Sequence, residues 1–197
     1  MNDLGKAFTF VFKDPKWFTK FLIGAVFMVL SIFVVGIFIL AGYFVQVIQR
    51  VMHQEQNPLP DWNDIGAKLV LGFKFCVVYL IYLLPIILLY IPVVLLVVFG
   101  SLLEQANITE AFASIYIILI FLIIIPYSLF LAFMLPIISY RFAANKSIGE
   151  ALDIGAMFRS FRQNWQNTAI VALIAAGIQS FAAIGIVAFF VGIFLTI

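Results

Sequence analysis

The sequence predicts an all-α fold, a polytopic helical bundle that resides in a membrane. Of its 197 residues, 65% are hydrophobic and 10% are charged, against roughly 45–50% and about 25% in soluble domains. Four long stretches, 21–49, 75–103, 111–140 and 163–197, contain no Asp, Glu, Lys or Arg. About 20 helical residues cross a hydrocarbon core of about 30 Å, so each stretch is long enough to span.

The basic residues predict how these stretches are arranged. All eleven Lys and Arg fall in three patches: Lys6, Lys13, Lys16 and Lys20; Arg50, Lys68 and Lys74; Arg141, Lys146, Arg159 and Arg162. Four single crossings would put the second patch outside and the acidic gap 100–110 inside, which reverses the positive-inside bias. Hairpins that turn near 34–36 and 183–185 bring every cation to one face.

We therefore predict one transmembrane domain over 1–197, with both termini cytoplasmic. It has a hairpin, two long helices kinked by proline, and a second hairpin. These give six membrane-inserted helices, at about 17–34, 36–50, 75–100, 111–140, 165–182 and 186–197. Residues 37–49 rise only about 20 Å as a helix. A re-entrant hairpin and one long tilted helix over 21–50 therefore stay open as alternatives.

Three amphipathic segments, 3–13, 61–74 and 147–162, precede apolar stretches. Each carries an apolar helical face opposite a polar one, which is typical of helices that lie in the membrane interface. We assign helix starts to a capping residue, a first-turn proline or a capping box; these are Asp14, Pro15, Pro60, Asp61, Ser147 and Glu150. Trp17, Trp62 and Trp165 stand at these boundaries, so we expect them to be interfacial anchors.

Several short motifs follow one another along the chain. They are Asp14-Pro15-Lys16-Trp17; Gly42-Tyr43; Arg50; Leu59-Pro60-Asp61-Trp62-Asn63-Asp64 with Gly66 and Gly72; and Ala151-Leu152-Asp153-Ile154-Gly155. This order resembles a prokaryotic membrane family, the domain-of-unknown-function family numbered four thousand and thirteen. The resemblance covers nearly the whole chain and implies a helical membrane domain of bacteria or archaea. It implies no activity or substrate.

Prolines interrupt the two middle stretches, at Pro85, Pro92, Pro126 and Pro136. Matching broken helices are a pointer to a transporter binding site. We interpret them instead as kinks that let over-long helices fit and pack. The four stretches hold no ionisable Asp, Glu, Lys, Arg or His for a proton or ion pathway.

The remaining candidates have structural interpretations. His53 is expected to be an interfacial polar residue, and Cys76 to pack within an apolar face. The cations Arg141, Lys146, Arg159 and Arg162 are possible contacts for anionic lipid headgroups. With one Cys and one His, we expect no metal or other cofactor and no catalytic residues.

We therefore expect a non-enzymatic subunit that scaffolds, assembles or regulates a larger membrane complex. The alternative is a transporter or accessory permease for a lipid or hydrophobic peptide. The expected partners are the lipid bilayer and other membrane subunits or further copies of the chain. A net charge of +2 is too small for nucleic acid. The expected location is the cell membrane of a prokaryote.

Overall fold

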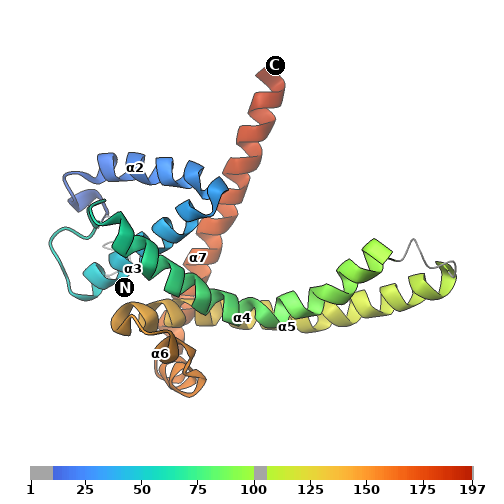
Figure 1. Cartoon of the computed structure of the whole chain (residues 1–197). Coiled ribbons are helices and arrows are strands. Elements are labelled where there is room, and N and C mark those ends of the chain that lie inside the picture. Colours follow the sequence, from blue (N-terminus) through green and yellow to red (C-terminus); the bar gives the residue numbers. More distant parts are fainter. Residues whose placement is uncertain (1–10, 100–105, 197) are drawn as a thin grey trace.

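The computed structural model describes residues 11–99 and 106–196, with the backbone alone at 13, 96–97, 99, 106–113 and 178–196 (Figure 1). Its described elements are all helical: η1 (Val11–Lys13), α2 (Trp17–Leu30), η2 (Ser31–Phe33), α3 (Val35–Met52), α4 (Ile65–Phe99), α5 (Ala106–Asn145), α6 (Ile148–Leu152) and α7 (Ile154–Thr196). Three helical segments, Val35–Met52, Ile65–Leu95 and Ser114–Asn145, are long and apolar enough to cross a membrane. The predicted helical class is confirmed. The predicted segment 3–13 lies largely outside the described residues.

Helices α2 and α3 form the predicted first hairpin. Its turn consists of η2 and Val34, which has a φ of 64°. A Cβ on Gly36 would overlap the backbone of Phe27 and Ser31, so the turn needs a glycine there. The alternative of one tilted helix over 21–50 is therefore wrong.

Helices α3 and α4 cross at very short range. A Cβ on Gly42 would overlap the backbone of Lys68, and a Cβ on Gly72 would overlap the carbonyl of Phe38. Small residues at such crossings let helix backbones touch, as in many membrane proteins. The two glycines therefore set the spacing of this pair.

Helix α4 also corrects the prediction of a separate interfacial helix at 61–74. Residues 61–64 are not helical, and Asp64 has a φ of 55°. From Ile65 the chain is one helix through to Phe99. Nothing after Ile65 interrupts the backbone hydrogen bonds before Pro85, so the amphipathic turns continue directly into the apolar ones.

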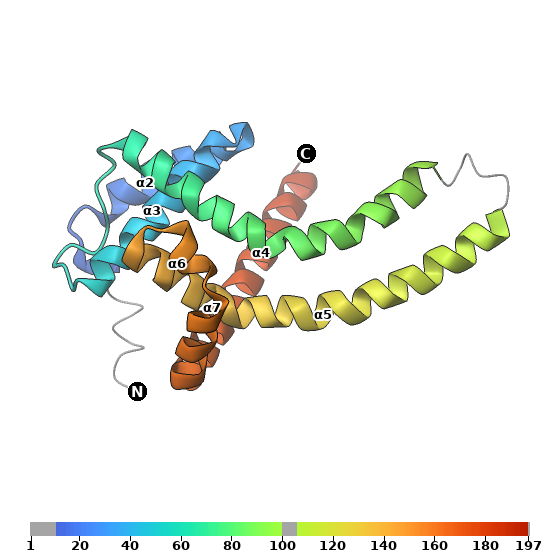
Figure 2. The same cartoon turned by 60° about the horizontal axis from the view of Figure 1, so that its bottom comes forward.

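The four prolines predicted to kink the middle stretches lie inside continuous helices, Pro85 and Pro92 in α4 and Pro126 and Pro136 in α5. Figure 2 shows both helices curving as they run side by side. Tyr127 donates its hydroxyl to the Tyr82 carbonyl at 2.7 Å, and Tyr116 donates to the Leu89 carbonyl at 3.1 Å. These carbonyls precede Pro85 and Pro92 by three residues. Proline removes the N–H that would bond the carbonyl four residues earlier, here that of Ile81 or Leu88, so these hydroxyls tie α5 to α4 one residue away from each break.

Helix α7 overturns the predicted second hairpin. It runs from Ile154 to Thr196 without a turn at 183–185, so the expected helices 165–182 and 186–197 are one. A Gly-containing apolar stretch offers no capping side chain, and leaving the helix there would strand backbone groups. The interruption lies earlier, at Asn164 (φ −127°, ψ 28°). The predicted segment 147–162 is also split at Asp153, between α6 and α7.

The core lies where α3, α4, α5 and α6 meet. Its buried side chains include Val45, Phe75, Val78, Ile138 and Phe142, each at most 5% exposed. Tyr82 ties α4 to α6, because its hydroxyl donates to the Ala151 carbonyl at 2.9 Å. Helix α7 crosses α5 at a steep angle in both views (Figures 1 and 2).

Candidate functional site

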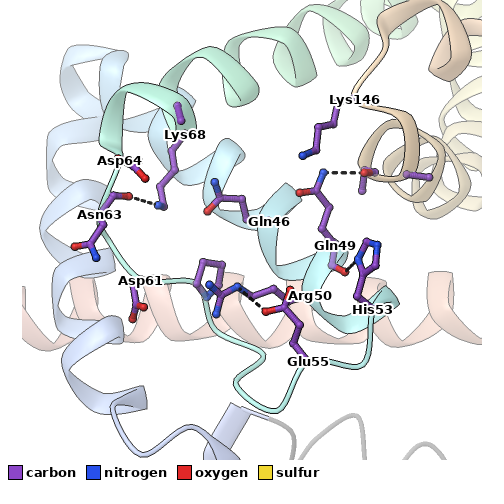
Figure 3. Close-up of a pocket in the computed structure, with 14 residues that line it drawn as sticks. Gln46, Gln49, Arg50, His53, Glu55, Asp61, Asn63, Asp64, Lys68 and Lys146 are labelled. Atoms are coloured by element: carbon purple, nitrogen blue, oxygen red, sulfur yellow. Dashed lines mark hydrogen bonds and ion pairs between the residues drawn. The ribbon is translucent and has the colours of Figure 1, made fainter.

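A polar pocket of about 710 Å³ opens where α3 ends, α4 begins and α5 ends (Figure 3). We call it the polar pocket. Its walls are polar or small side chains from these helices and the 53–64 connection: Gln46, Gln49, Arg50, His53, Glu55, Pro60, Asp61, Asn63, Asp64, Ala67, Lys68, Ala143, Ala144 and Lys146.

The end of α3 supplies one wall. Gln49 donates from Nε2 to the Ala143 carbonyl at 2.8 Å, which joins α3 to α5. His53 places its Nδ1 2.7 Å from the Gln49 carbonyl, so it acts as the donor there. Arg50 donates from Nη1 to the carbonyls of Asn57 and Leu59, both at 3.1 Å, and its Nε lies 3.4 Å from a Glu55 carboxylate oxygen. Arg50 therefore holds the 53–64 connection against the end of α3.

The start of α4 supplies the opposite wall. Lys68 is 2% exposed, and its ammonium donates to the Asn63 carbonyl. An ion pair between Asp64 and Lys68 would be the ordinary expectation for residues four apart on a helix. Asp64 lies outside the helix, so Lys68 caps the bend before α4 instead.

Behind the pocket, Lys20 of α2 gathers three acceptors. Its Nζ lies 2.8 Å from Asp14 Oδ2, 3.0 Å from Asp61 Oδ1 and 2.7 Å from the Leu59 carbonyl. The Lys20 and Asp14 side chains are 8% and 2% exposed, whereas that of Asp61 is 56% exposed. Each proton of the buried ammonium has an acceptor within reach. This arrangement is the Lys20 cluster.

Two carboxyl groups of the Lys20 cluster have perturbed pKa values. Burial raises the pKa of Asp14, but hydrogen bonds from the Lys20 ammonium and the Lys16 N–H, with the charges of Lys20 and Arg50, outweigh it. The net pKa of Asp14 lies below its ordinary value. The hydrogen bond and charge of Lys20 lower the pKa of Asp61 as well. Both carboxylates are therefore ionised near neutral pH.

Trp62 connects the pocket wall to the first hairpin. Its ring stacks on Tyr43 with centroids 4.2 Å apart and on Phe27 at 4.9 Å. Its Nε1 donates to the Lys20 carbonyl at 2.9 Å. Trp62 therefore packs between α2 and α3. It does not begin an amphipathic helix, although its position in the sequence suggested that it would.

One side of the polar pocket lies against the core. Ala143 lines the pocket and is 1% exposed within the core cluster. Phe75 and Phe142 pack behind it, with ring centroids 5.2 Å apart. The contact of Gly42 with the Lys68 backbone closes the space between α3 and α4. On the side of Ala143 the polar pocket therefore borders the packed core.

The predicted helix starts have mixed outcomes. Asp14 accepts the Lys16 N–H at 2.9 Å just before α2, and Pro15 is exposed beside it. Pro60 and Asp61 precede α4 by several residues and belong to the pocket wall, so their assignment as a helix start is wrong. Tertiary contacts hold them there.

The predicted capping box before α6 is absent. Ser147 occupies the N-cap position, but it makes no capping hydrogen bond through its side chain. Glu150 instead faces Arg141, at 3.4 Å between Oε2 and Nη2. The cap that the sequence analysis missed is Asp153, whose Oδ1 accepts the Ala156 N–H at 2.9 Å and begins α7.

The four cations predicted to contact lipid are separated in the structure. Arg141 donates to the Glu150 carbonyl at 3.0 and 2.9 Å, and its side chain is only 15% exposed, so its role is internal. Lys146 lines the polar pocket. Arg159 and Arg162 are exposed on the first turns of α7.

The other predicted anchors differ in their surroundings. Trp17 has edge contacts with Phe12, Phe18 and Phe21, at centroid distances of 5.1 to 6.2 Å. Trp165 is 55% exposed on α7. Cys76 is a free, partly buried thiol on α4. Within the described residues, no three His, Cys, Asp or Glu side chains are placed to hold a metal ion.

Sequence reasoning missed the residues that organise the site, Lys20, Gln49 and Lys68. Lys20 was counted only as one cation of a patch, and Gln49 as part of an apolar stretch. One feature of the sequence could have revealed Lys20. The motifs around Asp14 and Asp61 each contain a carboxylate, and a single cation could pair with both.

Comparison with known proteins places the chain in a family. No curated protein and no solved structure matches it. A family model described as "Protein of unknown function (DUF4013)" matches residues 21–197, which include α2 from residue 21 onward, α3 to α7 and the polar pocket. The chain belongs to this family of unknown function, the one that its motifs resemble.

Proposed function

We propose that this chain is a non-enzymatic integral membrane subunit that scaffolds, assembles or regulates a larger membrane complex, and that the polar pocket is where a partner docks. The observation that carries the proposal is that the pocket borders the packed core at Ala143. A polar segment of a partner can enter the pocket, but the packed core around Phe75 and Phe142 blocks passage on that side.

The charges of the pocket suit a protein partner. Arg50, Lys68 and Lys146 stand against Glu55, Asp61 and Asp64, so three cations balance three carboxylates. A balanced and partly self-paired set produces little net field for a highly charged small molecule. The pocket instead offers cationic donors and anionic acceptors. Complementary charges of this kind give specificity at protein interfaces.

The membrane helices support an assembly role too. Only 22%, 11% and 17% of the most apolar windows of the three spanning segments are buried inside the chain. Most of their apolar surface is therefore left for lipid or for the helices of other subunits. The proposal places the pocket on the cytoplasmic side of a prokaryotic cell membrane, because Arg50, Lys68 and Lys146 surround it.

A transporter or accessory permease for a lipid or hydrophobic peptide is the second candidate. The four prolines inside α4 and α5 favour it, since broken helices often form substrate sites. The bonds from Tyr116 and Tyr127 weigh against it, because they tie α5 to α4 one residue away from two of these breaks.

Charge reversal at the pocket tests the docking proposal. Lys146→Glu changes an exposed residue of the pocket, and Lys74→Glu makes the same change at an exposed residue of α4 outside it. The chain is purified from native membranes under mild conditions, and the stoichiometry of co-purified subunits is measured. We expect Lys146→Glu to lose a stoichiometric partner that the wild type and Lys74→Glu retain.

Two results would contradict the proposal. One is that neither variant changes the set of stoichiometric partners, or that the wild type has none. The other is that the purified chain alone moves a fluorescent lipid or hydrophobic peptide across a liposome membrane, which would favour the transporter.

A further inference from the structure

A second pair of cavities lies at the crossing of α5 and α7, apart from the polar pocket. One cavity, of about 310 Å³, has a polar end formed by Tyr140, Ser160, Asn164, Asn167 and Thr168. The other, of about 470 Å³, is lined mainly by apolar side chains that include Ala132, Leu135, Val171, Ala172, Ala175 and Ala176. Pro136, Tyr140 and Val171 border both cavities, so the two are contiguous. We call them together the α5–α7 groove.

The sequence of α7 explains why polarity changes along the groove. Residues 160, 164, 167, 171 and 175 recur at helical spacing and so lie on one face. The face begins with Ser and Asn and ends with Val and Ala. Asn164 departs from helical geometry, and Thr168 Oγ1 donates to its carbonyl at 3.0 Å. The bend therefore lies at the polar end, and the alanines make room at the apolar end.

The groove is open at its side. Tyr140 is 55% exposed, Val171 is 49% exposed, and Ala132 and Ala175 are exposed as well. Its α5 wall lies within Ser114–Asn145, one of the segments able to span a membrane. An occupant can therefore enter from the surrounding lipid.

Charge gives the groove a direction. Arg159 is exposed on α7 next to Ser160 of the polar end, whereas Arg162, two residues after Ser160, points toward the opposite side of the helix, and neither lines a cavity. At the other end the groove is lined by Ala172, Ala175 and Ala176. Cations beside uncharged hydrogen-bonding groups suit a phosphate diester, and a narrow apolar extension suits an acyl chain. An apolar partner helix would leave the polar end without a matching group.

We propose that the α5–α7 groove binds one glycerophospholipid. An acyl chain fills the apolar cavity, and the glycerol and phosphate oxygens accept hydrogen bonds from the Asn164 and Asn167 amides and the Tyr140 hydroxyl. Arg159, beside the polar end, attracts the phosphate. This lipid is distinct from the surrounding bilayer lipid, and the proposal is independent of docking at the polar pocket.

The test uses the full chain in phosphatidylcholine vesicles that contain a small fraction of phosphatidylglycerol with a photoactivatable diazirine within one acyl chain. Labelled residues are mapped by peptide mass spectrometry. We expect labelling to concentrate on the apolar residues of the groove. Even labelling of these residues and of Leu122 and Leu173, which are 71% and 68% exposed elsewhere, would mean bilayer lipid only and would overturn the proposal.

Matched variants distinguish a blocked α5–α7 groove from general destabilisation of the fold. Ala175→Trp fills the apolar cavity, whereas Leu173→Trp puts the same ring on a residue of α7 that does not line it. Asn167→Leu removes a polar group of the groove, and Gln166→Leu removes its exposed neighbour outside it. We expect labelling of the groove to fall roughly tenfold in Asn167→Leu, the effect of a lost charge-assisted hydrogen bond. Ala175→Trp should also lower it strongly, and neither control should.

The headgroup is tested with a diacylglycerol that carries the same diazirine chain. We expect it to label the groove roughly tenfold less than phosphatidylglycerol, because it lacks the phosphate. Equal labelling by both probes would overturn the assigned headgroup contacts. Should Ala175→Trp fail to fold, the Asn167→Leu and Gln166→Leu pair still decides the outcome. Cross-links to a second protein in native membranes, with no lipid label, would replace the lipid by a partner helix.

Discussion

Lys20 and Asp14 form a buried ion pair, with 2.8 Å between Nζ and Oδ2 and both side chains under 10% exposed. The pair joins the start of α2 to the connection before α4, because the same ammonium also reaches the Leu59 carbonyl and Asp61. It therefore fixes the back wall of the polar pocket. Removing one partner of such a pair leaves an uncompensated buried charge.

Replacing Asp14 with Asn separates its two roles. Asn can still accept the Lys16 N–H, as a cap does, but it cannot neutralise Lys20. We expect Asp14→Asn and Asp14→Ala to lower the free energy of unfolding by about 3 kcal/mol each. Equilibrium unfolding in mixed micelles measures this free energy. Wild-type stability of Asp14→Asn would show that only the cap matters.

The Lys20 cluster should make the fold sensitive to acid. The folded pKa values of Asp14 and Asp61 lie below their ordinary values, so the unfolded chain binds more protons. Their contribution is complete above the unfolded pKa, near 4, and is lost as pH falls through the folded values. We expect thermal stability to fall below about pH 4 in the wild type. The loss of thermal stability below about pH 4 should be smaller in Lys20→Met than in the wild type. An equal loss in both would contradict the assignment of the acid sensitivity to the Lys20 cluster.

Glycines in α3 and α4 give a matched test of helix packing. Ala at Gly42 or Gly72 would overlap the backbone of the facing helix, so we expect each change to lower the free energy of unfolding by about 3 kcal/mol or more. Gly66→Ala and Gly177→Ala meet nothing within 4 Å. They should be neutral or stabilise their helices by up to about 1 kcal/mol. Similar effects at all four positions would argue against the close crossing.

Trp62 should matter more than its neighbours in the connection. Trp62→Ala removes the stacking on Tyr43 and Phe27 together with the bond to Lys20, and we expect a loss of about 3 kcal/mol. Trp62→Phe keeps a ring and should lose about 1 kcal/mol. Limited proteolysis between Gln54 and Asp64 measures the loosening. His53→Ala and Cys76→Ala serve as controls, and greater cleavage in either than in Trp62→Ala would refute this ranking.

The turn of the first hairpin contains an unfavourable residue. Val34 has a φ of 64° and a ψ of −39°, a region that a β-branched residue rarely adopts. Val34→Gly should therefore raise the free energy of unfolding by about 1 kcal/mol, as relief of strain outweighs the added freedom of the unfolded chain. Val35→Gly, at the first residue of α3, is the control and should destabilise. Destabilisation by both would show that Val34 is not strained.

The sequence alone determined features that depend on composition and on neighbours along the chain. The long apolar stretches predicted the helical class and the presence of helices long and apolar enough to cross a membrane, because lipid accommodates so much apolar surface. The turn near Gly36 was also predicted, since the distribution of basic residues favoured a hairpin there over one tilted helix. The order of motifs was sufficient to indicate the family.

Only the tertiary structure decided how the polar pocket and the Lys20 cluster are built. Their contacts join residues that are far apart in the sequence and that no helical periodicity relates. Lys20 meets the Leu59 carbonyl 39 positions away, and Trp62 meets the Lys20 carbonyl 42 positions away. These contacts place Pro60 and Asp61, predicted to start a helix, in the wall of the polar pocket, and they pack Trp62 between α2 and α3. The continuity of α7 past 183–185 was likewise decided by backbone hydrogen bonding, because an apolar helix without caps has nothing to end it. Charge counting predicted a turn there, but the energy of a broken backbone ladder is the larger effect.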